Sequence, residues 1–185
     1  MSGSEHPRLP LAVLETSFWT VAYKGEVVAN ILDYFTLIVP AAVGAEISAR
    51  STRYPAREYP DQTLFRQLRA RMQEEPPDMP PPLNVFGPGE AAAIALAQHV
   101  GQRGVPVTLL VNEGRATAYA RNLRLSVLTV PSFIVALCSR GTISDWAARL
   151  RLRRIAPNTP ADYIQQAELV LDMLRASRHG EGENG

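Results

Sequence analysis

The sequence has little cysteine, little net charge and no long apolar run, and each lack excludes a class of protein. Cys138 is the only cysteine among 185 residues, so the chain can form no internal disulfide and offers no cluster with zinc-ligand spacing. A free thiol without disulfides is typical of a reducing compartment. The formal net charge is only +1, which excludes a global positive field that would attract nucleic acid.

The lack of long apolar runs bears on the membrane. No stretch of about 18 apolar residues exists, which argues against a transmembrane helix. The polar start, MSGSEHPRLP, has neither the basic nor the apolar region of a signal peptide. We therefore expect a soluble, cytoplasmic protein without a membrane partner.

The length and the hydrophobic fraction of 46% fit one globular domain. We place this domain at residues 9–177 and expect the polar ends, 1–8 and 178–185, to be disordered. Residues 76–89 are rich in proline, which prevents helix and strand alike, so we expect a linker there within the domain.

Short apolar runs alternate with helical patterns along the domain. This alternation predicts an α/β fold, a three-layer α/β/α sandwich around a parallel sheet of four or five strands. Binding sites in such sheets form at the carboxyl ends of the strands. The expected strands are 11–14, 36–39, 107–111 and 126–130, and the expected helices are 17–35 (broken near Gly25), 41–50, 62–75, 90–100, 114–123, 132–140, 144–154 and 160–177.

Four glutamates occupy positions of interest in this arrangement. Glu15 and Glu113 follow two different strands at their carboxyl ends, Glu90 begins a helix that leads to one of these strands, and Glu46 lies in a helix after the second strand. Each has an ordinary explanation alone; Glu90, for example, complements a helix N-terminus, worth ~0.3–1 kcal/mol. Together, carboxylates are the ligands that Mg²⁺ prefers, and paired metal ions can hydrolyse a phosphodiester.

Several segments of the sequence resemble the PIN domain family, in particular the branch of ribonuclease toxins from toxin–antitoxin pairs. LAVLETSFW is similar to the family's opening strand, which ends in an acidic residue followed by Thr or Ser. IVPAAVGAEI and GPGEAAAIALA are similar to its second and third acidic segments. VNEGRATAYARNLRL, with SVLTVPSFIVALCSRGTI after it, is similar in spacing to the fourth. The resemblance covers roughly residues 11–143.

The resemblance implies a Mg²⁺- or Mn²⁺-dependent endoribonuclease in which metal-activated water attacks the phosphodiester. The metal ligands would be Glu15, Glu46, Glu90 and Glu113, bound directly or through water, with Asn112 orienting water or substrate. The family usually has Asp at the position of Glu15 and two adjacent aspartates where this chain has Asn112 and Glu113, so a weak or decayed nuclease is expected. The alternative is an inactive PIN-like module that binds RNA or a protein.

Arginines and tyrosines gather in residues 50–71, where arginine can contact phosphate and aromatic rings can stack on unpaired bases. A solvated, arginine-rich helix explains this composition equally well. As a partner we expect single-stranded or structured RNA. The resemblance also implies an antitoxin protein, and the sequence leaves open whether the chain forms a homodimer. The RNA-binding candidates are Arg50, Arg53, Tyr54, Arg57 and Arg66.

Overall fold

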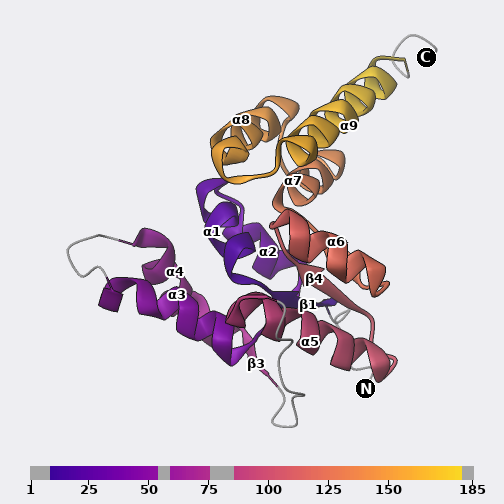
Figure 1. Cartoon of the computed structure of the whole chain (residues 1–185). Coiled ribbons are helices and arrows are strands. Elements are labelled where there is room, and N and C mark those ends of the chain that lie inside the picture. The colour runs from indigo at the N-terminus through magenta and orange to yellow at the C-terminus, as the bar shows by residue number, and fades with distance from the viewer. Residues whose placement is uncertain (1–8, 54–58, 76–85, 181–185) are drawn as a thin grey trace, which may run out of the picture.

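The computed structural model describes residues 9–53, 59–75 and 86–180 (Figure 1). Its centre is a five-stranded sheet in the order β3-β2-β1-β4-β5 in which every pairing is parallel. The expected α/β fold with a helix-flanked parallel sheet is therefore confirmed. The strands are β1 (Leu11–Leu14), β2 (Thr36–Val39), β3 (Gln73–Glu74), β4 (Val107–Leu110) and β5 (Ser126–Leu128).

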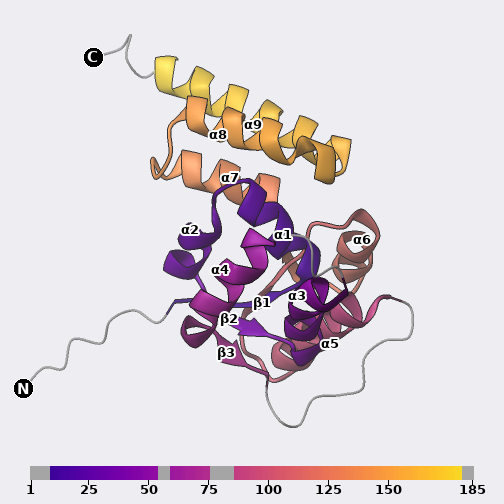
Figure 2. The ribbon, with the colours of Figure 1, turned by 90° about the vertical axis from the view of Figure 1, so that its left-hand side faces the viewer.

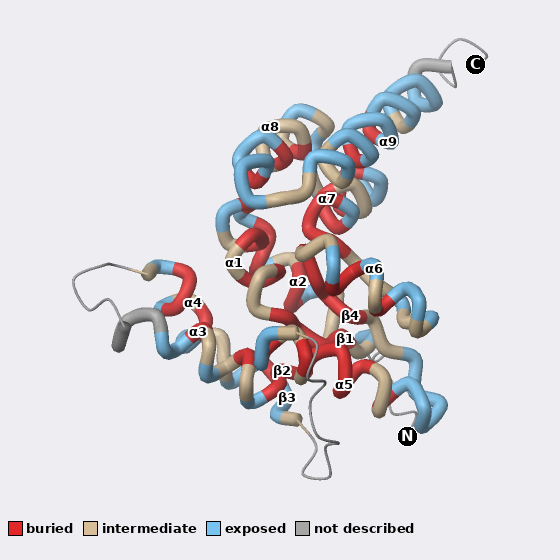
Figure 3. The backbone as a smooth tube through the Cα atoms, in the orientation of Figure 1, coloured by how far each residue is buried: buried red, intermediate tan, exposed pale blue. Residues whose placement is uncertain are grey.

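The two central strands are apolar on both faces because helices cover both. Val13 of β1 pairs with Ile38 of β2 and Leu109 of β4, and all three side chains are buried. Figure 3 shows this buried sheet at the middle of the molecule. A continuous apolar run is what a parallel sheet with two covered faces requires.

Helices connect successive strands and pack on the sheet. The right-handed crossovers of this strand order place helices on both faces of the sheet, and Figures 1 and 2 show the helices packed around it. The helices are α1 (Thr16–Lys24), α2 (Val28–Tyr34), α3 (Ala41–Arg53), α4 (Pro60–Leu68), α5 (Pro88–Gln102), α6 (Gly114–Asn122), α7 (Val130–Ser139), α8 (Asp145–Ile155) and α9 (Ala161–Gly180), with 3₁₀ turns at Arg69–Arg71 and Ala156–Asn158.

The last three helices form a further layer. α9 packs on α7 and α8, and its C-terminal end extends away from the sheet (Figures 1 and 2). The two tryptophans differ in environment. Trp19 is fully buried with its ring edge-to-face on Phe65 at 5.2 Å, whereas Trp146 of α8 is 72% exposed and takes no part in the core.

The main departure from the expected elements lies in residues 62–75, for which the sequence predicts one helix. The helix α4 ends at Leu68, and after a 3₁₀ turn Met72 has extended backbone (φ −110°, ψ 149°). This extension lets Gln73 pair with Ile38 as a short edge strand. The helical spacing of apolar residues continues to Met72, although the helix has already ended at Leu68. Met72 is buried as well, so the apolar pattern gives no sign of where the helix ends.

Two expected boundaries are also shifted. α5 begins at Pro88, inside the expected linker 76–89, because proline suits the first turn of a helix; residues 76–85 lie outside the described residues. α9 continues to Gly180, past the expected domain end at 177. Of the helices in the described part of the chain, none combines the length and the apolar character needed to cross a membrane.

Candidate functional site

Glu15 joins the end of β1 to the start of α1. Its backbone N–H donates to Leu110 O at 3.1 Å, which continues the pairing with β4. Its carboxylate caps α1 by accepting from Ser17 N at 2.8 Å and Phe18 N at 3.2 Å, and the Ser17 hydroxyl donates to it as well. Only 2% of the residue is exposed. Burial raises the pKa of Glu15 and outweighs these hydrogen bonds, and the charge of Glu90 raises it further.

Glu46 ties three helices together. Its Oε2 accepts from the Thr16 hydroxyl of α1 at 2.6 Å, and its Oε1 accepts from the Gly89 N–H of α5 at 2.7 Å. A Cβ on Gly89 would lie 2.7 Å from Cδ of Glu46 and 2.8 Å from Oγ1 of Thr16. Glycine is therefore required here so that the first turn of α5 can approach the carboxylate.

Glu90 lies next to Gly89 in the first turn of α5 and is half-buried. Burial raises its pKa most, the negative charge of Glu113 comes next among the raising causes, and that of Glu46 adds to them. A hydrogen bond from Gly87 N–H and the positive charge of Arg115 act in the opposite direction. Glu90 thus interacts electrostatically with each of the other three glutamates.

Glu113 follows β4 and caps α6, accepting from Ala116 N at 2.6 Å. The hydrogen bonds of Glu46 to Thr16 and to Gly89 place it beside the residues next to Glu15 and Glu90 in the chain, and the charge of Glu113 acts on Glu90. Glu90 interacts electrostatically with Glu15, Glu46 and Glu113, and two of the four stand at the carboxyl ends of the neighbouring strands β1 and β4. We call Glu15, Glu46, Glu90 and Glu113 the acidic cluster.

Asn112, beside this cluster in sequence, has a different environment. It is 2% exposed. Its Oδ1 accepts from Val130 N at 3.2 Å, and its Nδ2 donates to Thr159 Oγ1 at 3.2 Å and to Asn158 O at 3.4 Å. Both ends of the amide are already occupied, so this side chain fastens the end of β4 to α7 and to the segment before α9.

The oxygen donors of the acidic cluster suit a hard divalent cation in type. In the described residues, however, no three groups from His, Cys, Asp and Glu are placed to hold a metal ion together. Three of the carboxylates already accept hydrogen bonds from N–H groups in the first turns of helices. The cluster thus fits a cation held by one or two carboxylates and water, as Mg²⁺ often is, and does not fit a cage of protein ligands. Glu113 is the glutamate whose charge acts most strongly on Glu90, so these two would hold it.

The predicted RNA-binding residues do not all fall in the described structure. Arg50 and Arg53 belong to α3, but their side chains are outside the description, and Tyr54 and Arg57 lie outside the described residues altogether. Arg66 is exposed on α4 and lines a cavity of about 410 Å³ between α4 and α3, which Gly44 and Ser48 also line. These two positions are about 200° around the helix from Glu46, so Arg66 lies on the other side of α3 from the acidic cluster.

Arg115, whose charge acts on Glu90, contacts two aromatic residues, and none of the three was selected from the sequence. The guanidinium carbon of Arg115 is 5.4 Å from the centre of the Phe86 ring, and that ring meets Tyr119 edge-on at 5.1 Å. The sequence could have indicated two of them. Arg115 follows Glu113 by two residues, and Tyr119 lies one helical turn after Arg115 on the same face of the helix.

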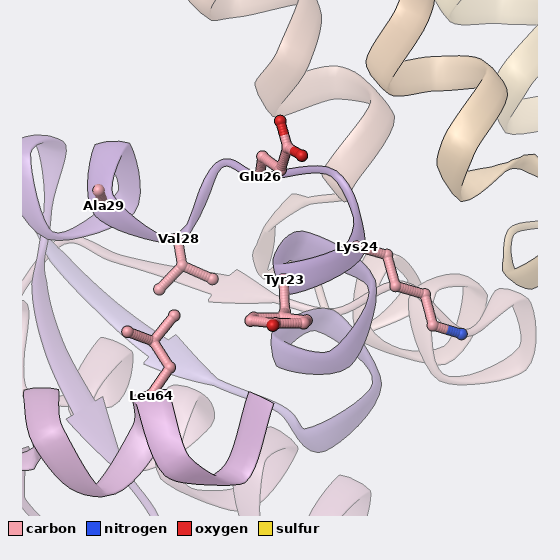
Figure 4. A pocket seen from close by; sticks show the side chains of 6 residues that line it. All are labelled: Tyr23, Lys24, Glu26, Val28, Ala29 and Leu64. Carbon is pink, nitrogen blue, oxygen red and sulfur yellow. The ribbon is translucent and has the colours of Figure 1, made fainter. Parts of the chain in front are cut away.

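A further cavity of about 400 Å³ lies between α1, α2 and α4 (Figure 4). Its walls are Tyr23, Val28 and Leu64, and both of its charged side chains are engaged elsewhere. Lys24 Nζ donates to Asn158 Oδ1 at 2.6 Å, and Glu26 forms an ion pair with Arg154.

Comparison with known proteins adds no assignment. No protein-family model matches the chain, and no curated protein matches it significantly.

Proposed function

We propose that this protein is a metal-dependent endoribonuclease of low activity, working at the acidic cluster. The observation that carries the proposal is the joint placement of four glutamates: Glu15 and Glu113 follow the neighbouring strands β1 and β4, and Glu46 holds the first turn of α5, which contains Glu90. Such a concentration of negative charge is costly without a cation, and this edge of a parallel sheet is where sites form.

Each glutamate has a separate task in this proposal. Glu90 and Glu113 hold the cation, which when bound supplies a Lewis acid and an activated water. Glu46 holds the first turn of α5 in place through Gly89, and Glu15 holds the first turn of α1. The cluster thereby keeps its carboxylates in fixed positions before substrate arrives, which is the main protein contribution to phosphodiester cleavage.

Low activity follows from the geometry of the donors. Most carboxylates of the cluster share their oxygens with helix N–H groups, and the amide of Asn112 supplies no negative charge. A displacement of about 1 Å in such a site can cost roughly a hundredfold in rate. We expect Mn²⁺, which suits a wider range of sites than Mg²⁺ does, to support more cleavage.

A second candidate function is an inactive module that binds RNA or protein. The same hydrogen bonds support it, because a carboxylate that caps a helix stabilises the fold without any metal, and no set of three ligands occurs in the described residues. The two candidates differ in one consequence: only the nuclease requires Glu90 to remain a carboxylate.

The test is cleavage of an end-labelled, unstructured RNA by the full chain with Mn²⁺. Wild type should cleave, chelator should stop cleavage, and Glu90→Gln should lower the rate at least tenfold, or about 1.4 kcal/mol of barrier. The matched control is Glu168→Gln, at an exposed glutamate of α9, which should cleave like wild type. Equal rates for wild type and Glu90→Gln would reveal a contaminating nuclease. No cleavage by wild type with Mn²⁺ or with Mg²⁺ would leave the binding module as the function.

A further inference from the structure

Arg115 stands out as a positive charge beside a cluster of negative ones. It is the second residue of α6, two positions after Glu113, and it is exposed. No hydrogen bond or ion pair joins its guanidinium to another described residue. Its charge nevertheless reaches Glu90, on which it acts against the raising effect of the other glutamates. Arg115 therefore lies at the rim of the acidic cluster with its N–H donors unused by the described residues.

The position of the Arg115 guanidinium is fixed by an aromatic pair. It lies over the ring of Phe86 at 5.4 Å, and Phe86 in turn is held by Tyr119 in an edge-on contact at 5.1 Å and 67°. Both rings are half-buried. A guanidinium placed over a ring is held through its face, which leaves the N–H donors at its edge free to point outward.

The elements that carry these residues are the ones that carry the cluster. Phe86 precedes α5, whose first turn holds Glu90, and Arg115 with Tyr119 belongs to α6, which Glu113 caps. α5 and α6 contact one another on the same face of the sheet (Figure 1). The brace formed by Phe86 and Tyr119 thus fixes Arg115 relative to the two glutamates assigned to the cation.

A polyanion cannot approach the acidic cluster without a positive group to receive it, since like charges repel. We propose that Arg115, held on Phe86, binds a backbone phosphate of single-stranded RNA and thereby positions the strand over the acidic cluster. This inference rests on the proposed nuclease for its biological meaning, but the binding itself requires no metal. Arginine suits the role because its planar donors match two phosphate oxygens at once.

The experiment measures binding of the full chain to a short, end-labelled oligouridylate by fluorescence anisotropy, in chelator, across a range of salt concentrations. Arg115→Gln should raise Kd roughly fivefold and reduce the slope of log K against log salt by about 0.7, the value for one phosphate contact on a single strand. Arg115→Lys should keep the salt slope but bind more weakly than wild type, because lysine is a point charge without the planar fork. Phe86→Leu should weaken binding by removing the brace.

The matched control is Arg121→Gln, which removes another exposed arginine from the far end of the same helix and should leave Kd and slope unchanged. A second readout has the opposite sign: Arg115→Gln should bind Mn²⁺ more tightly, because a repelling positive charge is gone.

The inference is overturned if wild type does not bind the oligonucleotide, if Arg115→Gln keeps the wild-type Kd and slope, or if Arg121→Gln loses as much affinity. Failure of the nuclease proposal would look different, because RNA would bind through Arg115 but would not be cleaved with Mn²⁺.

Discussion

At the scale of single residues, Gly89 carries the geometry of the site. It is the point at which α5 comes close enough to donate its N–H to Glu46, and the space that a side chain would need is taken by Glu46 and Thr16. The close approach explains why no residue with a side chain fits at this position.

We expect Gly89→Ala to lower the free energy of unfolding by about 1–3 kcal/mol, the usual cost of overpacking a filled site. Gly101→Ala is the matched control on the same helix, because an added Cβ there meets nothing within 4 Å. Alanine at this helical position should raise stability by about 0.5–1 kcal/mol. Urea denaturation of both variants is the measurement, and a Gly89→Ala protein as stable as Gly101→Ala would contradict the described approach.

The sequence predicts where the four glutamates stand, but not what their oxygens do. Strand ends and helix starts can be located from apolar runs, so Glu15, Glu90 and Glu113 could be selected. The capping of α1 by Glu15 and of α6 by Glu113 depends on χ angles that the pattern does not contain. Asn112 shows the same limit, because its partners Val130 and Thr159 are far along the chain.

At the scale of elements, the apolar strands β1, β2 and β4, each of four residues, were predictable, and the two-residue strand β3 was not. Its residues, Gln73 and Glu74, are polar and exposed, so they have no β pattern, and their pairing to β2 follows only from the turn before them. Helix ends also depend on backbone conformations that cannot be predicted from residue type alone. The expected break near Gly25 is confirmed, because α1 ends at Lys24 with Gly25 as its C-cap, but the residue with positive φ is Glu26 (54°) and not the glycine.

The end of α6 allows a test of such a helix terminus. Arg124 has φ 60°, and the N–H groups of Arg124 and Leu125 donate to Arg121 O and Ala120 O, so this arginine occupies the left-handed position that glycine prefers. Arg124→Gly should raise the free energy of unfolding by about 1 kcal/mol.

The control for that prediction is Arg121→Gly, at an exposed position inside the last turn of α6. It should lower stability by about 1 kcal/mol, since glycine is a poor helix former. Thermal unfolding followed by circular dichroism compares the two, and shifts of equal sign would show that α6 does not end as described.

At the scale of the whole molecule, the acidic cluster predicts how stability depends on pH without metal. Burial raises the pKa of Glu15 and of Glu90 above the ordinary value of 4.5. The folded chain therefore binds more protons than the unfolded chain in the window above that value, and the free energy of unfolding falls as pH rises through it.

In chelator, Glu90→Gln should melt at a higher temperature than wild type at neutral pH, because a neutral side chain at this position is not repelled by the other glutamates. Its melting temperature should also depend less on pH. Glu168→Gln, on α9 far along the chain, should follow the wild-type curve. Differential scanning calorimetry across this pH range is the measurement. A Glu90→Gln protein that is destabilised at neutral pH would mean that the carboxylate is held by attraction and not under repulsion.

The central claim is that the acidic cluster binds a divalent cation, and the anomalous difference map of a crystal of the full chain soaked in Mn²⁺ tests it most directly. We expect a manganese peak in contact with the carboxylates of Glu90 and Glu113, and we expect this peak to be absent from crystals of Glu90→Gln. Millimolar Mn²⁺ that leaves no peak beside any of the four glutamates, in a crystal where this edge of the sheet is open to solvent, would contradict it.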